Sequence, residues 1–310
     1  MSERSDWVHM HLLTYDVTNK RHKSETNVNI VECKVCLLNS ATTRLTKINS
    51  DYYCEECLNL INNPVDKNKI QSDWNKYVQK IKLNRAGKYD VLFAFSGGKD
   101  SVAALHFIVK KYGLNPLVFT VDHGFKSETV INNCINIVNL LKVDWLLTKV
   151  TDEIKEKLRN ITKNGDLPCL YCNELWKADY FRNVVKLTGI NVIFTGGDTL
   201  VNGNFEIPKS EWGVKSVGLP LAVQFLTEEE IYNVAYSVGW IDPKLKGWDT
   251  DCLAVGASLH KYRNQNNIYH VEELKHLSHR IRHGVLEKED ARKKLLTEMC
   301  IEPEILKLFE

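Results

Sequence analysis

The chain has 310 residues, of which 44% are hydrophobic, and its 41 lysine and arginine residues nearly balance 39 aspartate and glutamate residues, for a formal net charge of +2. This length predicts one large domain with a smaller one beside it, and the hydrophobic fraction is sufficient for a packed core. The balanced charge does not demand a nucleic-acid partner, although a local basic patch could still bind phosphate.

No stretch approaches the roughly 18 apolar residues of a membrane span. The first residues, MSERSDWVHM, lack the basic-then-apolar layout of a signal peptide. We therefore expect a cytoplasmic protein with no membrane partner. In a reducing compartment, its nine cysteines are more typical of metal binding or catalysis than of a disulfide framework.

Residues 1–30 are polar and weakly patterned, which predicts an N-terminal arm. Two C-x2-C pairs follow, Cys33 with Cys36 and Cys54 with Cys57. Four thiolates at this spacing suit tetrahedral Zn2+, and the spacer between the pairs alternates enough to form a short hairpin. We favour a structural zinc site over a finger that contacts RNA or substrate, because closed four-cysteine sites are usually structural.

A helix is predicted over 66–86, where Ile70, Trp74, Tyr77 and Ile81 recur at helical spacing. We assign residues 31–82 to the zinc finger and this linker helix. Residues 83–245 are assigned to the main domain, and residues 246–310 to a C-terminal helical segment.

An apolar strand over Val91–Phe95 runs directly into Ser96–Ser101, called here the SGGKDS loop, and then into an apolar-periodic helix. Strand, glycine-rich turn and helix together form a site for phosphate. Gly97 and Gly98 let backbone N–H groups approach an anion, and the helix dipole points its positive end at the same place. Lys99 adds a charge, and Ser96 and Ser101 add hydroxyl groups. The spacing fits neither a Walker A loop nor G-x-G-x-x-G.

Further strands are predicted over 116–121, 144–149 and 191–195, with helices between them. This alternation predicts an α/β fold with a doubly wound parallel sheet, in which ligands lie beyond the carboxyl ends of the strands. That rule places Thr120, Asp122, Gly196 and Asp198 around the same crevice as the SGGKDS loop. Asp100 and Asp198 are candidate Mg2+ ligands, since this ion prefers carboxylate oxygens. For Asp122 and Asp198, ordinary turn chemistry is an equal alternative.

A third C-x2-C pair, Cys169 with Cys172, opens a helix inside the main domain, and Cys252 follows in a distant polar turn. Three thiolates would leave one iron of a [4Fe–4S] cluster without a protein ligand. The alternatives are a catalytic cysteine, a second zinc site, or half-buried thiols without a role. Cys134 and Cys300 stand alone in helical patterns, so we expect them to behave as small apolar residues.

Thr227 and Glu230 have the spacing of a capping box, which predicts that a helix begins there. A helical hairpin is predicted near the C-terminus, over 276–284 and 287–296. The histidines and arginines of its first half, HLSHRIRHG, could face phosphate. Such a charged stripe is more often a solvated helix face, and we favour that interpretation.

The SGGKDS loop behind a hydrophobic strand resembles the signature of the PP-loop ATP pyrophosphatases. This resemblance implies a PP-loop/HUP-like fold, with ATP and Mg2+ as cofactors. It also implies that the loop holds the phosphates while ATP is split into AMP and pyrophosphate. In relatives, the end of the second strand contacts adenine, and the later glycine-rich strand end lies near the ribose or phosphates. Thr120, Asp122, Gly196 and Asp198 stand at these places.

The inner cysteines, Cys169, Cys172 and Cys252, resemble those of the iron–sulfur tRNA thiolases. There a C-x2-C pair after the third strand and a distant cysteine hold a [4Fe–4S] cluster beside the SGGKDS-type loop. In an older view of that chemistry, one of these cysteines carries a persulfide or forms a disulfide instead. The resemblance implies an adenylating sulfurtransferase.

A second resemblance covers most of the chain: a four-cysteine finger, SGGxDS, the stretch GLNPLVFTVDHGFKSETVINN, TGG and a closing L-x-x-R-I-R-x-G segment. This order is similar to that of the N-acetyl sugar amidotransferases of surface-polysaccharide pathways. In those enzymes, ammonia from a glutaminase partner attacks an adenylated acetamido oxygen.

Two enzyme hypotheses follow, and both begin with adenylation of a substrate oxygen. In the first, sulfur displaces AMP; in the second, ammonia does. Because of the inner cysteines, we favour the hypothesis in which sulfur displaces AMP. The partner is then a sulfur donor or a glutaminase, the substrate is a tRNA or a small molecule such as a sugar, and a homodimer is compatible with the sequence. An RNA-binding module without activity is disfavoured by the intact SGGKDS loop.

Overall fold

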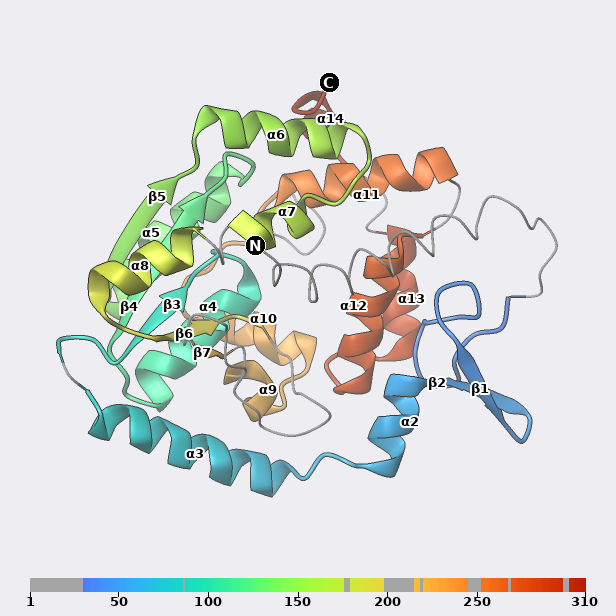
Figure 1. Ribbon diagram of the computed structural model, residues 1–310, viewed down its shortest axis with the longest axis horizontal. Helices are drawn as coiled ribbons and strands as arrows, with labels where there is room; N and C mark the ends of the chain where they lie inside the picture. The colour runs from blue at the N-terminus through green and yellow to red at the C-terminus, as the bar shows by residue number, and fades with distance from the viewer. Residues whose placement is uncertain are drawn as a thin grey trace, which may run out of the picture.

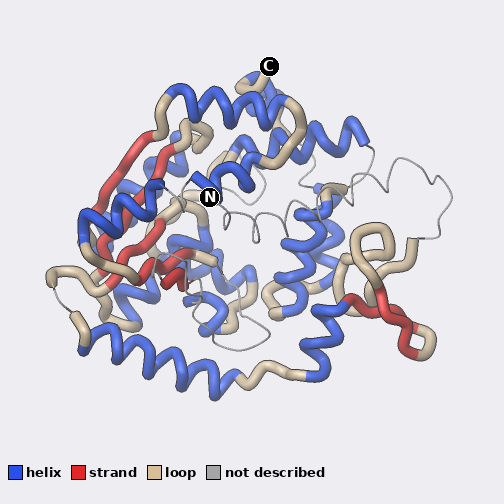
Figure 2. Tube along the Cα trace, viewed as in Figure 1, coloured by secondary structure: helices blue, strands red, loops and turns tan. Residues whose placement is uncertain are grey.

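The structure is a computed structural model that describes residues 30–85, 87–175, 179–197, 215–217, 220–244, 252–266, 269–297 and 301–310 (Figure 2). The predicted N-terminal arm lies outside these residues except for Ile30. No helix among the described residues combines the length and the apolar character that crossing a bilayer requires.

The centre of the fold is a five-stranded sheet in the order β5-β4-β3-β6-β7, and all four neighbouring pairs are parallel (Figure 1). Its strands are β3 (Val91–Ala94), β4 (Pro116–Asp122), β5 (Asp144–Lys149), β6 (Val192–Thr195) and β7 (Lys215–Val217). A separate antiparallel hairpin consists of β1 (Leu45–Ile48) and β2 (Asp51–Cys54). The hairpin predicted in the cysteine spacer is therefore confirmed.

The helices lie between and after the strands. They are α2 (Glu55–Asn62), α3 (Lys67–Leu83), α4 (Lys99–His106) with a π-helical extension η1 (Phe107–Lys111), α5 (Glu128–Leu141), α6 (Asp152–Lys163), α7 (Pro168–Leu175), α8 (Phe181–Thr188), α9 (Pro220–Gln224), α10 (Glu228–Ser237), α11 (Leu253–Asn266), α12 (Val271–Arg282), α13 (Lys288–Thr297) and α14 (Pro303–Lys307).

Both faces of the sheet are covered, because successive side chains of a strand point to opposite faces. Val91 and Phe93 pack on one side with residues from α3, α4, α5 and α10. Leu92 packs on the other side with Leu117, Ile193 and residues of α8. The predicted doubly wound parallel sheet is confirmed.

Helix α3 is part of this main core. Its buried residues Ile70, Trp74 and Tyr77 belong to the same cluster as Val91 and Phe93 of β3. The ring centroid of Trp74 lies 5.6 Å from that of Phe194 on β6. The helix predicted as a linker therefore packs under the sheet and supports it.

The four N-terminal cysteines share a second core with α12 and α13. Leu37, Leu274, Leu277, Ala291 and Leu295 are buried together with the four cysteines. We call residues 31–57 the four-cysteine module. In Figure 1, α12 and α13 stand between this module and the sheet. The predicted C-terminal hairpin is thus present, and it connects two parts of the fold.

Candidate functional site

The SGGKDS loop begins where β3 ends, and α4 begins at Lys99. The Ser101 hydroxyl donates to the Gly98 carbonyl oxygen at 2.9 Å and accepts from the Gly97 N–H at 3.2 Å. The Ser96 hydroxyl lies 3.0 Å from that of Ser101 and accepts from the Gly98 N–H at 3.3 Å. The two serines therefore hold the turn in one shape at the N-terminus of α4, where an anion is favoured.

Two glycines allow close packing around the loop. Gly97 has a φ of +86°, and a Cβ atom there would lie 2.5 Å from the Cys134 Sγ and 2.9 Å from the Val130 carbonyl oxygen. At Gly196, after β6, a Cβ atom would lie 2.6 Å from the Cα atom of Ser101. Gly196 therefore lies against the loop, as predicted, and Cys134 is buried as expected, directly below Gly97.

A tryptophan that the sequence analysis did not single out also holds the loop. The Trp240 indole N–H donates to the Gly97 carbonyl oxygen at 3.0 Å, and the side chain is 2% exposed. The next residue, Ile241, exchanges two hydrogen bonds with the side-chain amide of Asn133 on α5, at 2.7 and 3.0 Å. The segment after α10 is thereby fixed against the loop.

Lys99 is fully buried, and its charge is shared within an ionic network. Its Nζ lies 2.8 Å from Asp100 Oδ2 and 4.0 Å from Glu228 Oε1 on α10. Arg280 Nη2 of α12 is 3.0 Å from the same Glu228 oxygen, and Arg280 Nη1 is 3.9 Å from Asp100 Oδ1. Lys294 Nζ of α13 is 2.7 Å from Glu228 Oε1. Elements far apart in the sequence thus meet at the loop.

The pKa of Glu228 is lowered in this network. Burial raises it, but the charges of Lys294, Arg280 and Lys99 outweigh burial. Glu228 is therefore ionised at neutral pH. The solvated-face interpretation of 276–284 is wrong for Arg280, which is 2% exposed. The burial of Arg280 could not be predicted from the sequence, because the residue lies in a charged stripe that is typical of a surface helix.

The remaining residues predicted to contact the nucleotide or Mg2+ differ in what the structure shows. The Thr120 hydroxyl donates to the Phe95 carbonyl oxygen at 2.8 Å and accepts from the Trp145 indole at 2.9 Å. Because Thr120 is 1% exposed, it links strands, and its contact with adenine stays a prediction. Asp122 accepts from the Gly124 N–H at 2.8 Å, which is turn chemistry. Asp198 lies outside the described residues, and its Mg2+ role, like that of Asp100, stays a prediction.

The inner cysteines lie on two helix starts. Cys169 and Cys172 belong to the first turns of α7, and Cys252 immediately precedes α11. Burial raises the pKa of the Cys172 thiol to about 12, and the Lys126 ammonium opposes this rise. Cys172 and Cys252 pack against the same apolar cluster, whereas Cys169 is exposed.

Two contacts bring this region to the loop. Lys126 Nζ, whose charge acts on Cys172, donates to the Ser96 carbonyl oxygen at 2.9 Å. The Leu253 N–H, next to Cys252, donates to the Phe125 carbonyl oxygen at 2.9 Å. The turn after β4 therefore contacts both the SGGKDS loop and the start of α11. The sequence analysis did not single out Lys126.

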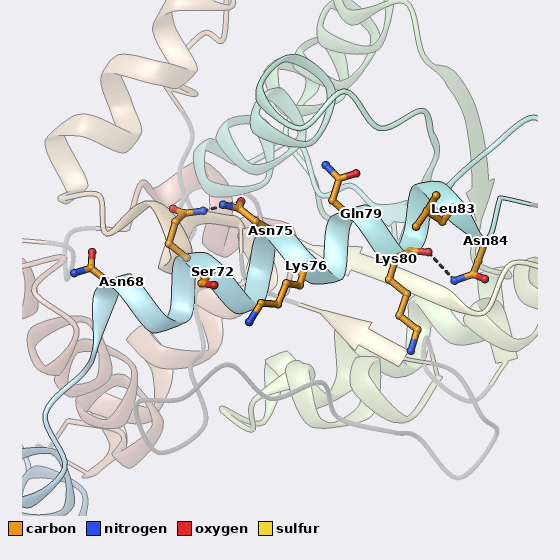
Figure 3. A pocket seen from close by; sticks show the side chains of 9 residues that line it. Asn68, Ser72, Asn75, Lys76, Gln79, Lys80, Leu83 and Asn84 are labelled. Carbon is orange, nitrogen blue, oxygen red and sulfur yellow. Dashed lines mark hydrogen bonds between the residues drawn. The ribbon is translucent and has the colours of Figure 1, made fainter.

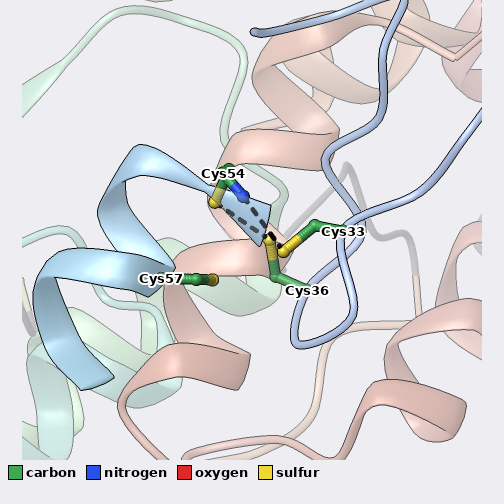
Figure 4. Close-up of side chains that lie close together, drawn as sticks. All are labelled: Cys33, Cys36, Cys54 and Cys57. Carbon is green, nitrogen blue, oxygen red and sulfur yellow. Dashed lines mark hydrogen bonds between the residues drawn. The ribbon is translucent and has the colours of Figure 1, made fainter. Parts of the chain in front are cut away.

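The four cysteines of the module have the geometry of a metal site (Figure 4). Their Sγ atoms all lie within 4.8 Å of one another, and all four residues are buried. Cys36 Sγ and Cys54 Sγ are 3.7 Å apart. A tetrahedron with zinc–sulfur bonds of about 2.3 Å has edges of about 3.8 Å. Cys33, Cys36, Cys54 and Cys57 therefore fit one tetrahedral ion, as predicted.

A surface hollow along α3 is a different kind of feature (Figure 3). It is lined by Asn68, Gln71, Ser72, Asn75, Lys76, Gln79, Lys80, Leu83 and Asn84. All of these belong to α3 or to its C-terminal cap. A hollow bordered by one helix face lacks the convergent walls of a ligand site.

The chain is similar to several known proteins. A family model described as a PP-loop domain matches residues 66–166. The uncharacterized protein MJ1599 of Methanocaldococcus jannaschii is 30% identical over 265 residues, covering 86% of this chain and 93% of that protein. An NH3-dependent NAD synthetase from Campylobacter jejuni, solved with a nitrate ion, is 15% identical with a TM-score of 0.36, covering 79% of this chain and 92% of that chain. The matched span of the family model begins at Asp66, the N-cap of α3, and includes the SGGKDS loop.

Proposed function

Because this chain belongs to the PP-loop ATP pyrophosphatase superfamily, in which ATP serves to adenylate a substrate, we propose that it replaces the adenylated oxygen of its substrate with sulfur. The observation that supports sulfur is that the turn after β4 contacts both the SGGKDS loop and the residue next to Cys252. Lys126 donates to the Ser96 carbonyl oxygen, and the Phe125 carbonyl oxygen accepts from the Leu253 N–H.

In the first step, a substrate carbonyl oxygen attacks the α-phosphorus of ATP, and the bond to the β-phosphate oxygen breaks, releasing pyrophosphate. The N-terminus of α4 and the Lys99 ammonium group stabilise the negative charge on the phosphates. This task is mainly one of positioning and electrostatics. The network of Lys99 with Asp100, Glu228 and Arg280 keeps the ammonium group in place.

In the second step, a hydrosulfide ion attacks the activated carbon, AMP leaves with the oxygen, and a C=S group remains after loss of a proton. No electrons change hands when sulfur enters as hydrosulfide. The donor set of Cys169, Cys172 and Cys252 is chemically suited to an iron–sulfur cluster, since it offers two thiols one helical turn apart and a third from α11. A cluster held there would supply an open iron for the incoming sulfide.

Amidation is the second candidate. Among the described residues, Cys169, Cys172 and Cys252 do not form a group close enough to bind one metal ion such as zinc. Ammonia delivered by a glutaminase partner would need no such group. The four-cysteine module and the loop would then act as they do in the first proposal.

Replacing Lys99 tests the adenylation step. We expect Lys99→Met to lower substrate-dependent pyrophosphate release by at least about 100-fold, because the positive charge that we propose to stabilise the reacting phosphates is lost. Lys110→Met, on the exposed side of η1, is the matched control and should retain wild-type activity. Pyrophosphate release from folded Lys99→Met at the wild-type rate would contradict the assignment of this loop.

Replacing Cys252 separates sulfur from ammonia. Protein purified without oxygen should contain iron and acid-labile sulfide, and Cys252→Ala should lose both along with C=S product, while ATP binding persists. Cys134→Ala, which removes a buried thiol elsewhere, should retain the iron and sulfide. Wild-type protein with zinc alone, and Cys252→Ala with unchanged product formation, would instead support amidation.

A further inference from the structure

Helix α12 lies against the four-cysteine module along one of its faces. The Ser278 hydroxyl accepts from the Leu37 N–H at 3.1 Å, and Arg282 Nη1 lies 3.8 Å from Cys36 Sγ. Ser278 and Arg282 are four positions apart, so they share one face of the helix. Because Leu37 directly follows Cys36, both contacts are made to the first C-x2-C turn of the module. The last turn of α12 therefore lies beside the sulfur atoms.

Two kinds of donor reach these sulfur atoms. The Cys33 Sγ accepts from the Cys54 N–H at 3.4 Å, inside the module, whereas the Cys36 Sγ accepts from Arg282, which belongs to α12. The four Sγ atoms lie within 4.8 Å of one another, so the charge of Arg282 acts on the whole cluster. Glu56 of α2 is a further anion that attracts the same guanidinium group. A role of Arg282 at the cluster therefore has to be separated by experiment from its attraction to Glu56.

A metal site made of four thiolates is stabilised by such a cation. Four thiolates around one divalent ion leave an excess of negative charge, and all four cysteines are buried. Burying a charge without compensation is costly. Hydrogen bonds that reach metal ligands from outside the coordination sphere lower this cost, and their loss weakens metal binding. Arginine suits this position, because its guanidinium group stays charged and offers several N–H donors.

We propose that Arg282 is part of the metal site of the four-cysteine module, where its guanidinium group donates to Cys36 Sγ and compensates the negative charge of four thiolates around a divalent ion such as Zn2+. The four ligands come from the N-terminal module, and α12 completes the site from the other end of the chain. Arg282 acts through Cys36. This inference goes beyond the proposed function and does not depend on the reaction proposed there.

The test measures the Kd of the full chain for zinc, by competition with a chelator of known affinity. Arg282→Met, which keeps the length of the side chain but removes its charge and its donors, should raise the Kd about 10- to 100-fold. Arg282→Lys keeps the charge and should recover part of the loss. Lys275→Met removes a charge from an exposed pair on the same helix and should leave the Kd unchanged. Glu56→Gln should change it by less than about threefold, since surface charge pairs contribute little.

The cobalt(II)-loaded protein reports directly on the sulfur atoms through its thiolate-to-cobalt charge-transfer band. Without the hydrogen bond from Arg282, the Cys36 thiolate holds its electrons less tightly, so the band of Arg282→Met should move to longer wavelength. Arg282→Lys should move it less. If Arg282→Met folds only with metal bound, the band of the loaded protein still decides the question, because a role in packing alone would not shift it.

An unchanged zinc Kd in folded Arg282→Met, or an unshifted cobalt band, would overturn the proposal. So would a Glu56→Gln variant whose zinc Kd rises as much as that of Arg282→Met, because Arg282 would then act through the carboxylate and not at the sulfur atoms. A wild-type chain that binds neither zinc nor cobalt would overturn it as well.

Discussion

Gly97→Ala is expected to lower the free energy of unfolding by about 2–5 kcal/mol and to abolish nucleotide binding. A side chain at a φ of +86° costs about 1–2 kcal/mol, and overpacking costs about 1–3 kcal/mol more. The clash arises because the new Cβ atom would lie 2.5 Å from the Cys134 Sγ and 2.9 Å from the Val130 carbonyl oxygen. Urea denaturation and nucleotide titration measure the two effects.

A control variant separates backbone strain from the clash. Gly189 also has a positive φ, +70°, but a Cβ atom there would meet nothing within 4 Å. Gly189→Ala should therefore cost only the backbone strain, about 1–2 kcal/mol, and leave nucleotide binding intact. Adding Cys134→Ala to Gly97→Ala should recover part of the lost stability, because it removes the clash with the Cys134 Sγ. The recovery should be incomplete, because the Val130 carbonyl oxygen still crowds the new side chain. Equal losses in Gly97→Ala and Gly189→Ala would show that packing under the loop is unimportant.

Loss of the metal from the four-cysteine module is expected to unfold that module. Structural zinc sites bind with free energies on the order of 10 kcal/mol, comparable to the stability of an entire domain. Cys54→Ser should remove the metal and expose residues 31–57 to proteases, and α12 should loosen because its leucines share the core with the cysteines. Elemental analysis by mass spectrometry and limited proteolysis measure these changes.

Cys134→Ala is the matched control for this experiment, because Cys134 is equally buried but lies under the SGGKDS loop. It should retain the metal and the protease resistance of the module. A Cys54→Ser variant that keeps its metal, or a metal-free protein whose module resists proteases, would contradict a structural role for the site.

Features encoded by neighbouring residues could be predicted from the sequence. The strand, the glycine turn and the following helix are contiguous, so their residue types alone predicted the SGGKDS loop. The C-x2-C pairs enclose their own hairpin, so the clustering of the four cysteines followed from their spacing. The capping box of Thr227 and Glu230 is confirmed at the start of α10, because it involves one helical turn.

The surroundings of the loop depend on contacts that no local pattern reveals. Trp240 and Arg280 reach it from segments 143 and 180 residues after Gly97 and Asp100, respectively. The sequence of α12 is that of a charged surface helix, and only its packing between the module and α10 buries Arg280. In the same way, Thr120 was expected in the crevice, but its hydroxyl is used between strands.

The sequence by itself therefore determined the fold class, the SGGKDS turn and the cluster of four cysteines, since each depends on residues close together in the chain. Only the tertiary structure decided which distant charges surround Lys99 and that the turn after β4 contacts both the loop and the start of α11. The physical reason is that burial and charge pairing depend on which helices pack together. The sequence of a helix does not reveal whether one of its polar side chains faces water or a buried carboxylate.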